Sequence, residues 1–310
     1  MAVISYQKTE SEALEQIKKA IPDSMKENLV KKSKGLFAEL FESKIFPNHY
    51  LACSIDGIGT KLLIAAALDK YDTVGIDLVA MCANDLATLG NVQPFLFMDY
   101  LAVQEKVELK AGDIIRGIVK GLEMCDTAGI FRNDVKINFG KGETASIGEM
   151  LDSFKEGYGF DLAAAMIGKE GKTIGEVLLE PTRIYVKPVA EVAKKFSVVG
   201  VNSTGYGLKN FNRFNAGNAK VEFVIEAPLE PQKIFSVLQK ESGFSDEEMY
   251  QTFNMGMGFY LIVSEKDAND VLDILKNSGE DAKVVGFVRK ADRIRTILKR
   301  AGKDIVFEGY

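Results

Sequence analysis

Residues 51–70 read LACSIDGIGTKLLIAAALDK, and the rest of the chain is interpreted outward from this stretch. The apolar run 51–55 is typical of a short strand, and residues 60–70 favour a helix. The turn between them, DGIGTK at 56–61, carries two glycines that let a ligand approach the backbone. A helix N-terminus also attracts anions. The stretch therefore predicts a phosphate-binding strand–turn–helix unit, with an ordinary turn as the alternative.

The same turn carries the charges of a nucleotide–magnesium site. Asp56 offers carboxylate oxygens to a metal, and Lys61 offers a positive charge to phosphate. Magnesium prefers one or two carboxylates together with phosphate oxygens and water. The residue order differs from that of a Walker P-loop, so a nucleotide site here would be of another type.

A second polar group lies within the apolar segment GIDLVAMCAND at 75–85. Seven residues are close to two helical turns, so Asp77 and Asn84 share one helix face, and Asp85 lies about 80° round from Asp77. Polar side chains in so apolar a helix are costly unless they are paired. The pattern favours a metal or polar ligand, with a helix cap or hydrogen bonds within the core as the alternative.

Strand-like and helical runs alternate along the chain, which predicts an α/β (α+β layered) fold. Further strands are expected at 95–103, 134–139, 161–168, 221–227, 259–263 and 283–288. Helices are expected at 76–89, 110–125, 189–196, 231–239 and 265–276, the last with a capping box formed by Ser264 and Asp267. The polar stretch after residue 168 predicts two mixed domains, residues 1–168 and 169–310.

The composition is that of a globular protein and excludes several functions. The 310 residues carry a net charge of −5, which argues against a nucleic-acid surface. No apolar run could span a bilayer, and the N-terminus does not resemble a secretory signal. Cys53, Cys82 and Cys125 lack metal-ligand spacing and are expected to be buried thiols. These features predict a cytoplasmic protein.

Three further glycine-bearing segments fit either ligand contact or a simple turn. They are GKGETA at 140–145, NSTGYGL at 202–208 and FNMGMGF at 253–259. The first ends in a carboxylate after a predicted strand, which suits metal or nucleotide contact. The second could hold an anion in its backbone N–H groups.

In order along the chain, these segments resemble the AIR synthetase (phosphoribosylformylglycinamidine cyclo-ligase) family. The matching stretches are DGIGTKLLIA at 56–65, GIDLVAMCANDLATLG at 75–90, PFLFMDYLAV at 94–103, GKGETASIGEM at 140–150, LLEPTRIYVKPV at 178–189 and MYQTFNMGMGF at 249–259. The resemblance implies ATP-dependent closure of the imidazole ring of formylglycinamidine ribonucleotide. It also implies a homodimer with N-terminal sheets joined across the interface.

By motif position, the resemblance implies a role for each polar residue of these segments. The implied magnesium ligands are Asp56, Asp77, Asp85 and Glu143. The implied ATP contacts are Asp56, Gly57, Gly59, Thr60, Lys61, Asn84, Gly142 and Thr144. The implied catalytic residues are Lys61, Asp85 and Asn202.

The second half of the chain departs from the family pattern. The family's Ser-Gly-x-His-Ser-Asn-Gly segment is missing, and its HITGGG motif is NSTGYG at 202–207. The family histidine is therefore Asn202, and a family glycine is Tyr206. His49 is the single histidine of the chain and matches neither family histidine. A shortened cyclo-ligase is expected, with another ATP-using enzyme of the superfamily or a non-catalytic nucleotide-binding homologue as alternatives.

Overall fold

A computed structural model describes most of the second half of the chain and separate parts of the first. The described residues are 19, 29–30, 33, 35–99, 101–103, 110–125, 137–139, 166–167, 171–217 and 220–309. None of the helices within these ranges is long and apolar enough to cross a membrane.

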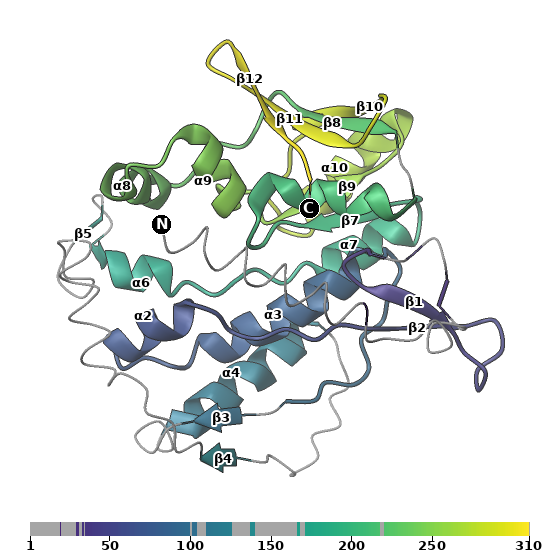
Figure 1. Cartoon of the computed structure of the whole chain (residues 1–310). Helices are drawn as coiled ribbons and strands as arrows, with labels where there is room; N and C mark the ends of the chain where they lie inside the picture. The colour runs from purple at the N-terminus through teal and green to yellow at the C-terminus, as the bar shows by residue number, and fades with distance from the viewer. Residues whose placement is uncertain are drawn as a thin grey trace.

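The first half places helices beside short two-stranded sheets (Figure 1). Its strands are β1 (Glu39–Glu42), β2 (Tyr50–Cys53), β3 (Leu101–Val103) and β4 (Ile137–Phe139), and its helices are α2 (Lys61–Ala67), α3 (Val74–Ala87) and α4 (Ala111–Met124). The first two strands form an antiparallel hairpin. The other two pair in parallel, with α4 between them in the chain as such pairing requires.

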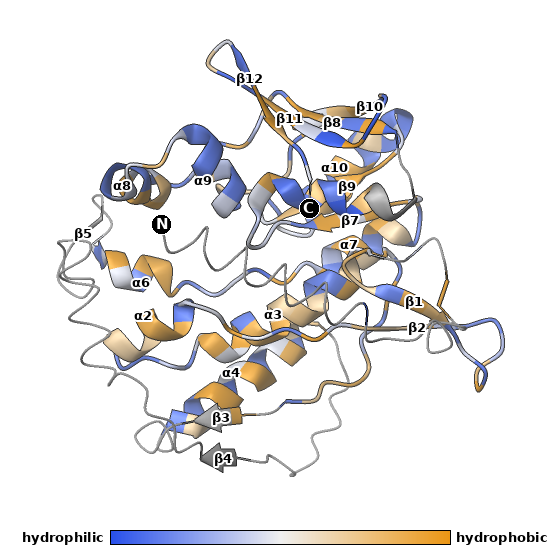
Figure 2. Ribbon diagram, viewed as in Figure 1, coloured by the Kyte–Doolittle hydropathy of each residue, from blue (hydrophilic) through white to orange (hydrophobic). Residues whose placement is uncertain are grey.

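Helices α3 and α4 pack side by side at their glycines. A Cβ on Gly75 would lie 2.1 Å from the carbonyl oxygen of Ile114, and one on Gly117 would lie 2.5 Å from that of Asp72. Only glycine permits so close an approach of two backbones. Both helices are largely hydrophobic (Figure 2), and their buried faces form the core of the first half.

The second half is built around a four-stranded sheet of order β10-β8-β11-β12. Its strands are β8 (Val221–Ile225), β10 (Gly286–Lys290), β11 (Arg295–Arg300) and β12 (Lys303–Phe307). Strands β7 (Val199–Asn202) and β9 (Phe259–Ile262) pair separately and antiparallel, as do β5 (Met166–Ile167) and β6 (Lys172–Thr173). The helices are α6 (Ile174–Leu178), α7 (Val186–Ala193), the 3₁₀ helix η4 (Gly207–Gly217), α8 (Lys233–Ser242), α9 (Asp246–Thr252), the 3₁₀ turn η5 (Glu265–Asp267) and α10 (Ala268–Asn277).

Helix α7 joins the two halves. Val186 and Val189 belong to the same buried cluster as the residues of α3 and α4, although they follow residue 168 in the chain. The next buried residue on α7, Val192, packs with Val198 and with Val271 of α10. The α/β fold class is confirmed, whereas the predicted division into domains at residues 168 and 169 stays a prediction.

The predicted capping box at Ser264 and Asp267 is wrong. Residues 265–267 form the 3₁₀ turn η5, and α10 begins after Asp267 without a side-chain cap. A carboxylate three residues on must reach back to the N-cap N–H, and the shorter aspartate does not do so here. The capping boxes that form use glutamate, in Thr173 with Glu176 and in Ser245 with Glu248.

Two other expectations need correction. Within the described part of the strand predicted at 95–103, only β3 is paired. Its partner β4 has three residues, and the pairing ends with them. Cys53 is exposed, whereas Cys125 is buried as predicted and Cys82 is half-buried.

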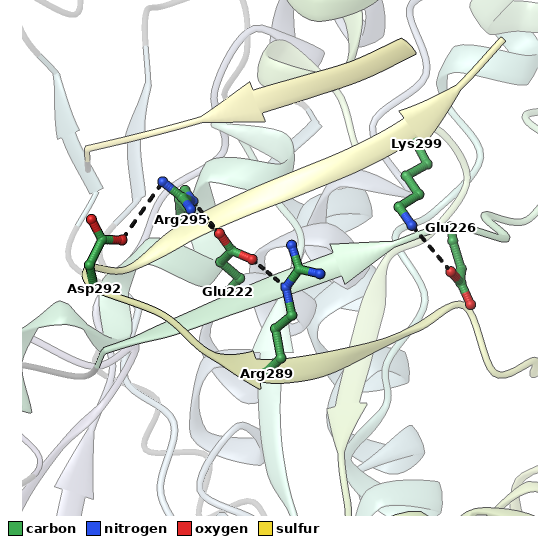
Figure 3. A network of polar contacts seen from close by, with 6 residues as sticks. All are labelled: Glu222, Glu226, Arg289, Asp292, Arg295 and Lys299. Atoms are coloured by element: carbon green, nitrogen blue, oxygen red, sulfur yellow. Dashed lines mark hydrogen bonds and ion pairs between the residues drawn. The ribbon is translucent and has the colours of Figure 1, made fainter. Parts of the chain in front are cut away.

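A charged network on the four-stranded sheet follows from strand register (Figure 3). Glu222 of β8 lies opposite Arg289 on one neighbouring strand and Arg295 on the other. Both guanidinium groups donate to its carboxylate, whose side chain is 4% exposed. The bond from Arg289, followed by that from Arg295, lowers the pKa of Glu222.

We expect Glu222→Gln to lower the melting temperature at neutral pH, because the variant leaves two arginines without their carboxylate. A lowered folded-state pKa gives stability that is present above the ordinary pKa of about 4.5 and is lost as pH falls further. The gap between wild type and variant should therefore be constant from pH 6 to 8 and close below about pH 4.5. Thermal unfolding followed by circular dichroism measures it, and a gap independent of pH would contradict the assignment.

Candidate functional site

The DGIGTK turn lies where the sequence predicts, between β2 and the start of α2. Residues 54–59 belong to no helix or strand and are mostly exposed, and a Cβ on Gly57 or Gly59 would meet no atom of the described residues within 4 Å. The backbone of the turn is thus open to a ligand. The Oδ1 atom of Asp56 accepts a hydrogen bond from the backbone N–H of Gly57 at 2.7 Å, which fixes the carboxylate at the turn.

Lys61 and Asp77 bind each other. Lys61 Nζ lies 2.9 Å from Asp77 Oδ1 and also donates to the carbonyl oxygen of Glu180 at 2.5 Å. Asp77 is 3% exposed, and its Oδ1 also accepts from the backbone N–H of Thr182 at 2.7 Å. Its buried Oδ2 has no hydrogen-bond partner among the described residues. The phosphate contact predicted for Lys61 and the metal contact predicted for Asp77 stay predictions.

Asn84 lies on the same face of α3 as Asp77, as the helical spacing predicts. It is fully buried, and it uses both ends of its amide. Its Nδ2 donates to the carbonyl oxygen of Arg183 at 2.9 Å, and its Oδ1 accepts from the backbone N–H of Tyr185 at 2.8 Å. The alternative of hydrogen bonds within the core is therefore realised for Asn84, and its predicted contact with ATP stays a prediction.

Asp85, the next residue of α3, also meets the second half of the chain. Asn202, the last residue of β7, donates from Nδ2 to Asp85 Oδ1 at 2.8 Å. The pKa of Asp85 is raised to about 6, mainly by burial and to a smaller extent by the nearby charge of Asp56, whereas Asn202 and Arg213 oppose the rise. The structure therefore brings together three predicted residues, Asp56, Asp85 and Asn202.

Cys82 and Asp99 belong to the same neighbourhood and were not predicted there. The backbone of Asp56 hydrogen-bonds to Cys82, and the charges of Asp56, Asp85 and Asp99 all act on its thiol. Burial, the largest cause, raises the pKa of Cys82 to about 11, so the thiol is protonated at neutral pH. Asp99 could have been found as a carboxylate inside the apolar run PFLFMDYLAV.

The carboxylates suit a hard divalent cation, although the described residues do not complete a site. No three His, Cys, Asp or Glu side chains within them lie close enough to hold a metal ion. Magnesium needs only one or two protein carboxylates when phosphate oxygens supply the rest, and Asp56 and Asp85 offer two. The predicted ligands Gly142, Glu143 and Thr144 lie outside the described residues.

Family models match nearly the whole described chain. Residues 40–169 match the AIR synthase related protein N-terminal domain, and residues 144–299 match its C-terminal domain. A phosphoribosylformylglycinamidine cyclo-ligase of Bacillus licheniformis is 35% identical over 300 positions that cover 84% of this chain and 83% of the relative. The enzyme of that name from Methanosarcina acetivorans is 35% identical over 302 positions, covering 85% and 86%.

The chain belongs to the AIR synthase family. Solved structures share this fold at low identity. The structure described as AaThiL complexed with AMPPCP and TMP has a TM-score of 0.55 at 15% identity and covers 91% of this chain and 93% of its own. The structure described as tt0281 from Thermus thermophilus has a TM-score of 0.53 at 14% identity and covers 84% and 88%.

This member of the AIR synthase family lacks some positions of its relatives, and their predicted location in the second half stays a prediction. The alignment with the Bacillus enzyme has 300 positions but spans only 84% of the 310 residues of this chain. Some of its positions are therefore residues of the relative that have no counterpart here. Tyr206 has φ +77°, a conformation that glycine adopts freely and that costs a tyrosine about 1–3 kcal/mol. This backbone conformation agrees with the sequence resemblance, which aligns Tyr206 with a glycine.

We expect Asp85→Asn to stabilise the protein at pH 7–8 by up to about 3 kcal/mol, because a raised pKa means that the charged carboxylate destabilises the folded state. The variant can still accept the bond from Asn202. The gain should shrink as pH falls through about 6 and vanish below about pH 4, where the carboxyl group is protonated in both states.

Urea unfolding between pH 4 and 8 measures this difference. Asp304→Asn, at an exposed position of β12, is the control and should leave stability unchanged. If Asp85→Asn were less stable than wild type at pH 8, the Asn202 and Arg213 interactions would outweigh burial and the assignment would be wrong.

Proposed function

We propose that the chain is an ATP-dependent phosphoribosylformylglycinamidine cyclo-ligase that closes the imidazole ring of formylglycinamidine ribonucleotide during purine synthesis. The observation that carries this proposal is the identity of about 35% with cyclo-ligases of that name over most of both chains. In the proposed reaction the γ-phosphoryl group of ATP moves to the amide oxygen. The internal amine then attacks the amide carbon that carries this oxygen. The oxygen leaves that carbon as part of inorganic phosphate, and aminoimidazole ribonucleotide forms.

The open DGIGTK turn is the proposed binding place of the ATP phosphates. The exposed backbone at Gly57 and Gly59 supports this proposal, as does the helix N-terminus that begins at Thr60 and Lys61. Asp56 lies at the same turn. When bound, magnesium would neutralise phosphate charge during transfer.

Asp85 and Asn202 form the proposed boundary between the nucleotide and the ribonucleotide. Their hydrogen bond joins a carboxylate of the first half to an amide of the second. Asp85 would hold magnesium together with Asp56, Asp77 and Glu143, and Gly142 and Thr144 would contact ATP. Asn202 has no proton to give or take near neutral pH, so its proposed role is to orient Asp85 and the substrate.

A second copy of the chain is the proposed partner, and the cytoplasm is the proposed location. Several large apolar side chains of the first half are exposed, which supports an interaction surface there. They are Ile45, Phe46, Tyr50, Ile55, Phe95 and Met98. The surface includes β2 and the hairpin that it forms with β1, which projects from the body of the molecule (Figure 1).

The cyclo-ligase proposal predicts ADP release that depends on formylglycinamidine ribonucleotide and yields aminoimidazole ribonucleotide. Asp56→Ala and Asp85→Ala should each lower kcat about 100-fold or more, since each removes a charge that holds the magnesium–phosphate group. A coupled ADP assay measures turnover, and the exposed-site variant Asp304→Ala should match wild type. ATP binding without turnover on this substrate would reject the proposal and favour a non-catalytic homologue or another ATP-using enzyme.

The dimer proposal predicts that the native chain sediments as a dimer. Phe95→Asp should yield monomers, because a charge placed in an apolar interface must be desolvated without a partner. Val306→Asp changes a comparably exposed apolar residue in the second half and should leave the dimer intact. Sedimentation velocity distinguishes the species, and a monomeric native chain would overturn the proposal.

A further inference from the structure

The segment 181–185, between α6 and α7, belongs to no helix or strand and is held by side chains. The carbonyl oxygen of Glu180, just before it, accepts from Lys61 Nζ. The backbone N–H of Thr182 donates to Asp77 Oδ1. Backbone groups that are removed from water need partners, and here charged side chains of α2 and α3 supply them.

Asn84 provides the next two bonds to this segment. Its Nδ2 donates to the carbonyl oxygen of Arg183, and its Oδ1 accepts from the N–H of Tyr185. One amide thereby acts as the peptide group of an adjacent strand would. Because Asn84 is 0% exposed, neither bond can be replaced by water without opening the contact between α3 and the segment.

The opposite side of the segment contacts the second half. Arg183 Nη1 lies 3.3 Å from Glu280 Oε2, just after α10. The ring of Tyr185 packs on that of Phe259 in β9 with centroids 5.3 Å apart. The segment therefore lies between α3 and the rest of the second half and contacts both.

We propose that Asn84 is a positioning residue, which sets the register of α3 against the second half so that Asp85 meets Asn202. This inference rests on the proposed function, in which that pair lies at the site. Asn84 and Asp85 are consecutive on α3, so a shift of the helix at one position moves the other. The contact at the end of α3 agrees, because Gly200 N–H of β7 donates to Thr88 O at 2.8 Å.

This role differs from the ATP contact predicted for Asn84 from the sequence. Both amide ends are engaged with the backbone of 183–185 and the side chain is 0% exposed, so contact with ATP would require opening the contact between α3 and this segment. A positioning role leaves ATP affinity unchanged and alters the geometry of the pair Asp85–Asn202. The two roles are therefore separable by measurement.

The experiment is a double-mutant cycle on Asn84→Ala and Asn202→Ala, with kcat measured in single-turnover reactions and ATP affinity by calorimetry. Misplacement of a reacting group by about 1 Å lowers rates about 100-fold. We expect Asn84→Ala to lower kcat by that factor in the native chain and by no more than about tenfold when Asn202 is already alanine. The dissociation constant of ATP should change by less than about threefold, since no ATP contact is lost.

Controls keep the result interpretable if folding suffers. Thr296→Val removes a buried hydrogen bond to Asn212 in the second half and should lower stability without changing kcat. Asn84→Asp, which retains the acceptor for Tyr185 and loses the donor to Arg183, replaces Asn84→Ala if the latter does not fold. Its effect on kcat should again be smaller in the Asn202→Ala background.

Two outcomes would overturn the inference. One is additive effects of Asn84 and Asn202 on kcat. The other is a large loss of ATP affinity in a folded Asn84 variant. If the native chain shows no cyclo-ligase turnover at all, the proposed function fails separately. Hydrogen exchange then tests the hydrogen bonds from Asn84 to residues 183–185. The amide of Tyr185 should exchange faster in Asn84→Ala and remain protected in Thr296→Val.

Discussion

The hydrogen bonds from α3 to the backbone of residues 182–185 are the constraint on which the rest of the structure depends. The apolar face of α3 packs on α4 through glycines, which leaves its polar face against the second half. An unpaired Asp77 or Asn84 would be expensive in that position. The observed register pairs Asp77 Oδ1 and both ends of the Asn84 amide with the backbone of residues 182–185, and a shift of α3 would break these bonds.

The same register creates the electrostatic character of the site. Asp85 is carried into a partly buried position beside Asp56, where burial and a like charge both raise its pKa. The fold tolerates this cost because Asn202 and Arg213 stabilise the carboxylate from the other half. A partly buried carboxylate with a raised pKa beside an exposed glycine turn is a candidate for a functional site.

The sequence predicts the local chemistry better than the long-range partners. Helical spacing placed Asp77 and Asn84 on one face correctly, because that depends only on the geometry of α3. It could not reveal that their partners are backbone groups about 100 positions further along the chain, since main-chain donors leave no mark in the sequence. Strands β11 and β12 were missed for a related reason. Their charged residues, such as Arg295, are explained by Glu222 on another strand and not by any local alternation.

Asn202, which the sequence resemblance aligns with a family histidine, fits this architecture. An asparagine cannot shuttle protons at neutral pH, but it can donate a fixed hydrogen bond to Asp85 in either state of that carboxyl group. Phosphoryl transfer depends mainly on positioning and on neutralisation of phosphate charge, and little on proton transfer by the protein. An asparagine at this position therefore lacks proton transfer, which phosphoryl transfer needs least. It keeps the hydrogen bond to Asp85 that joins the two halves.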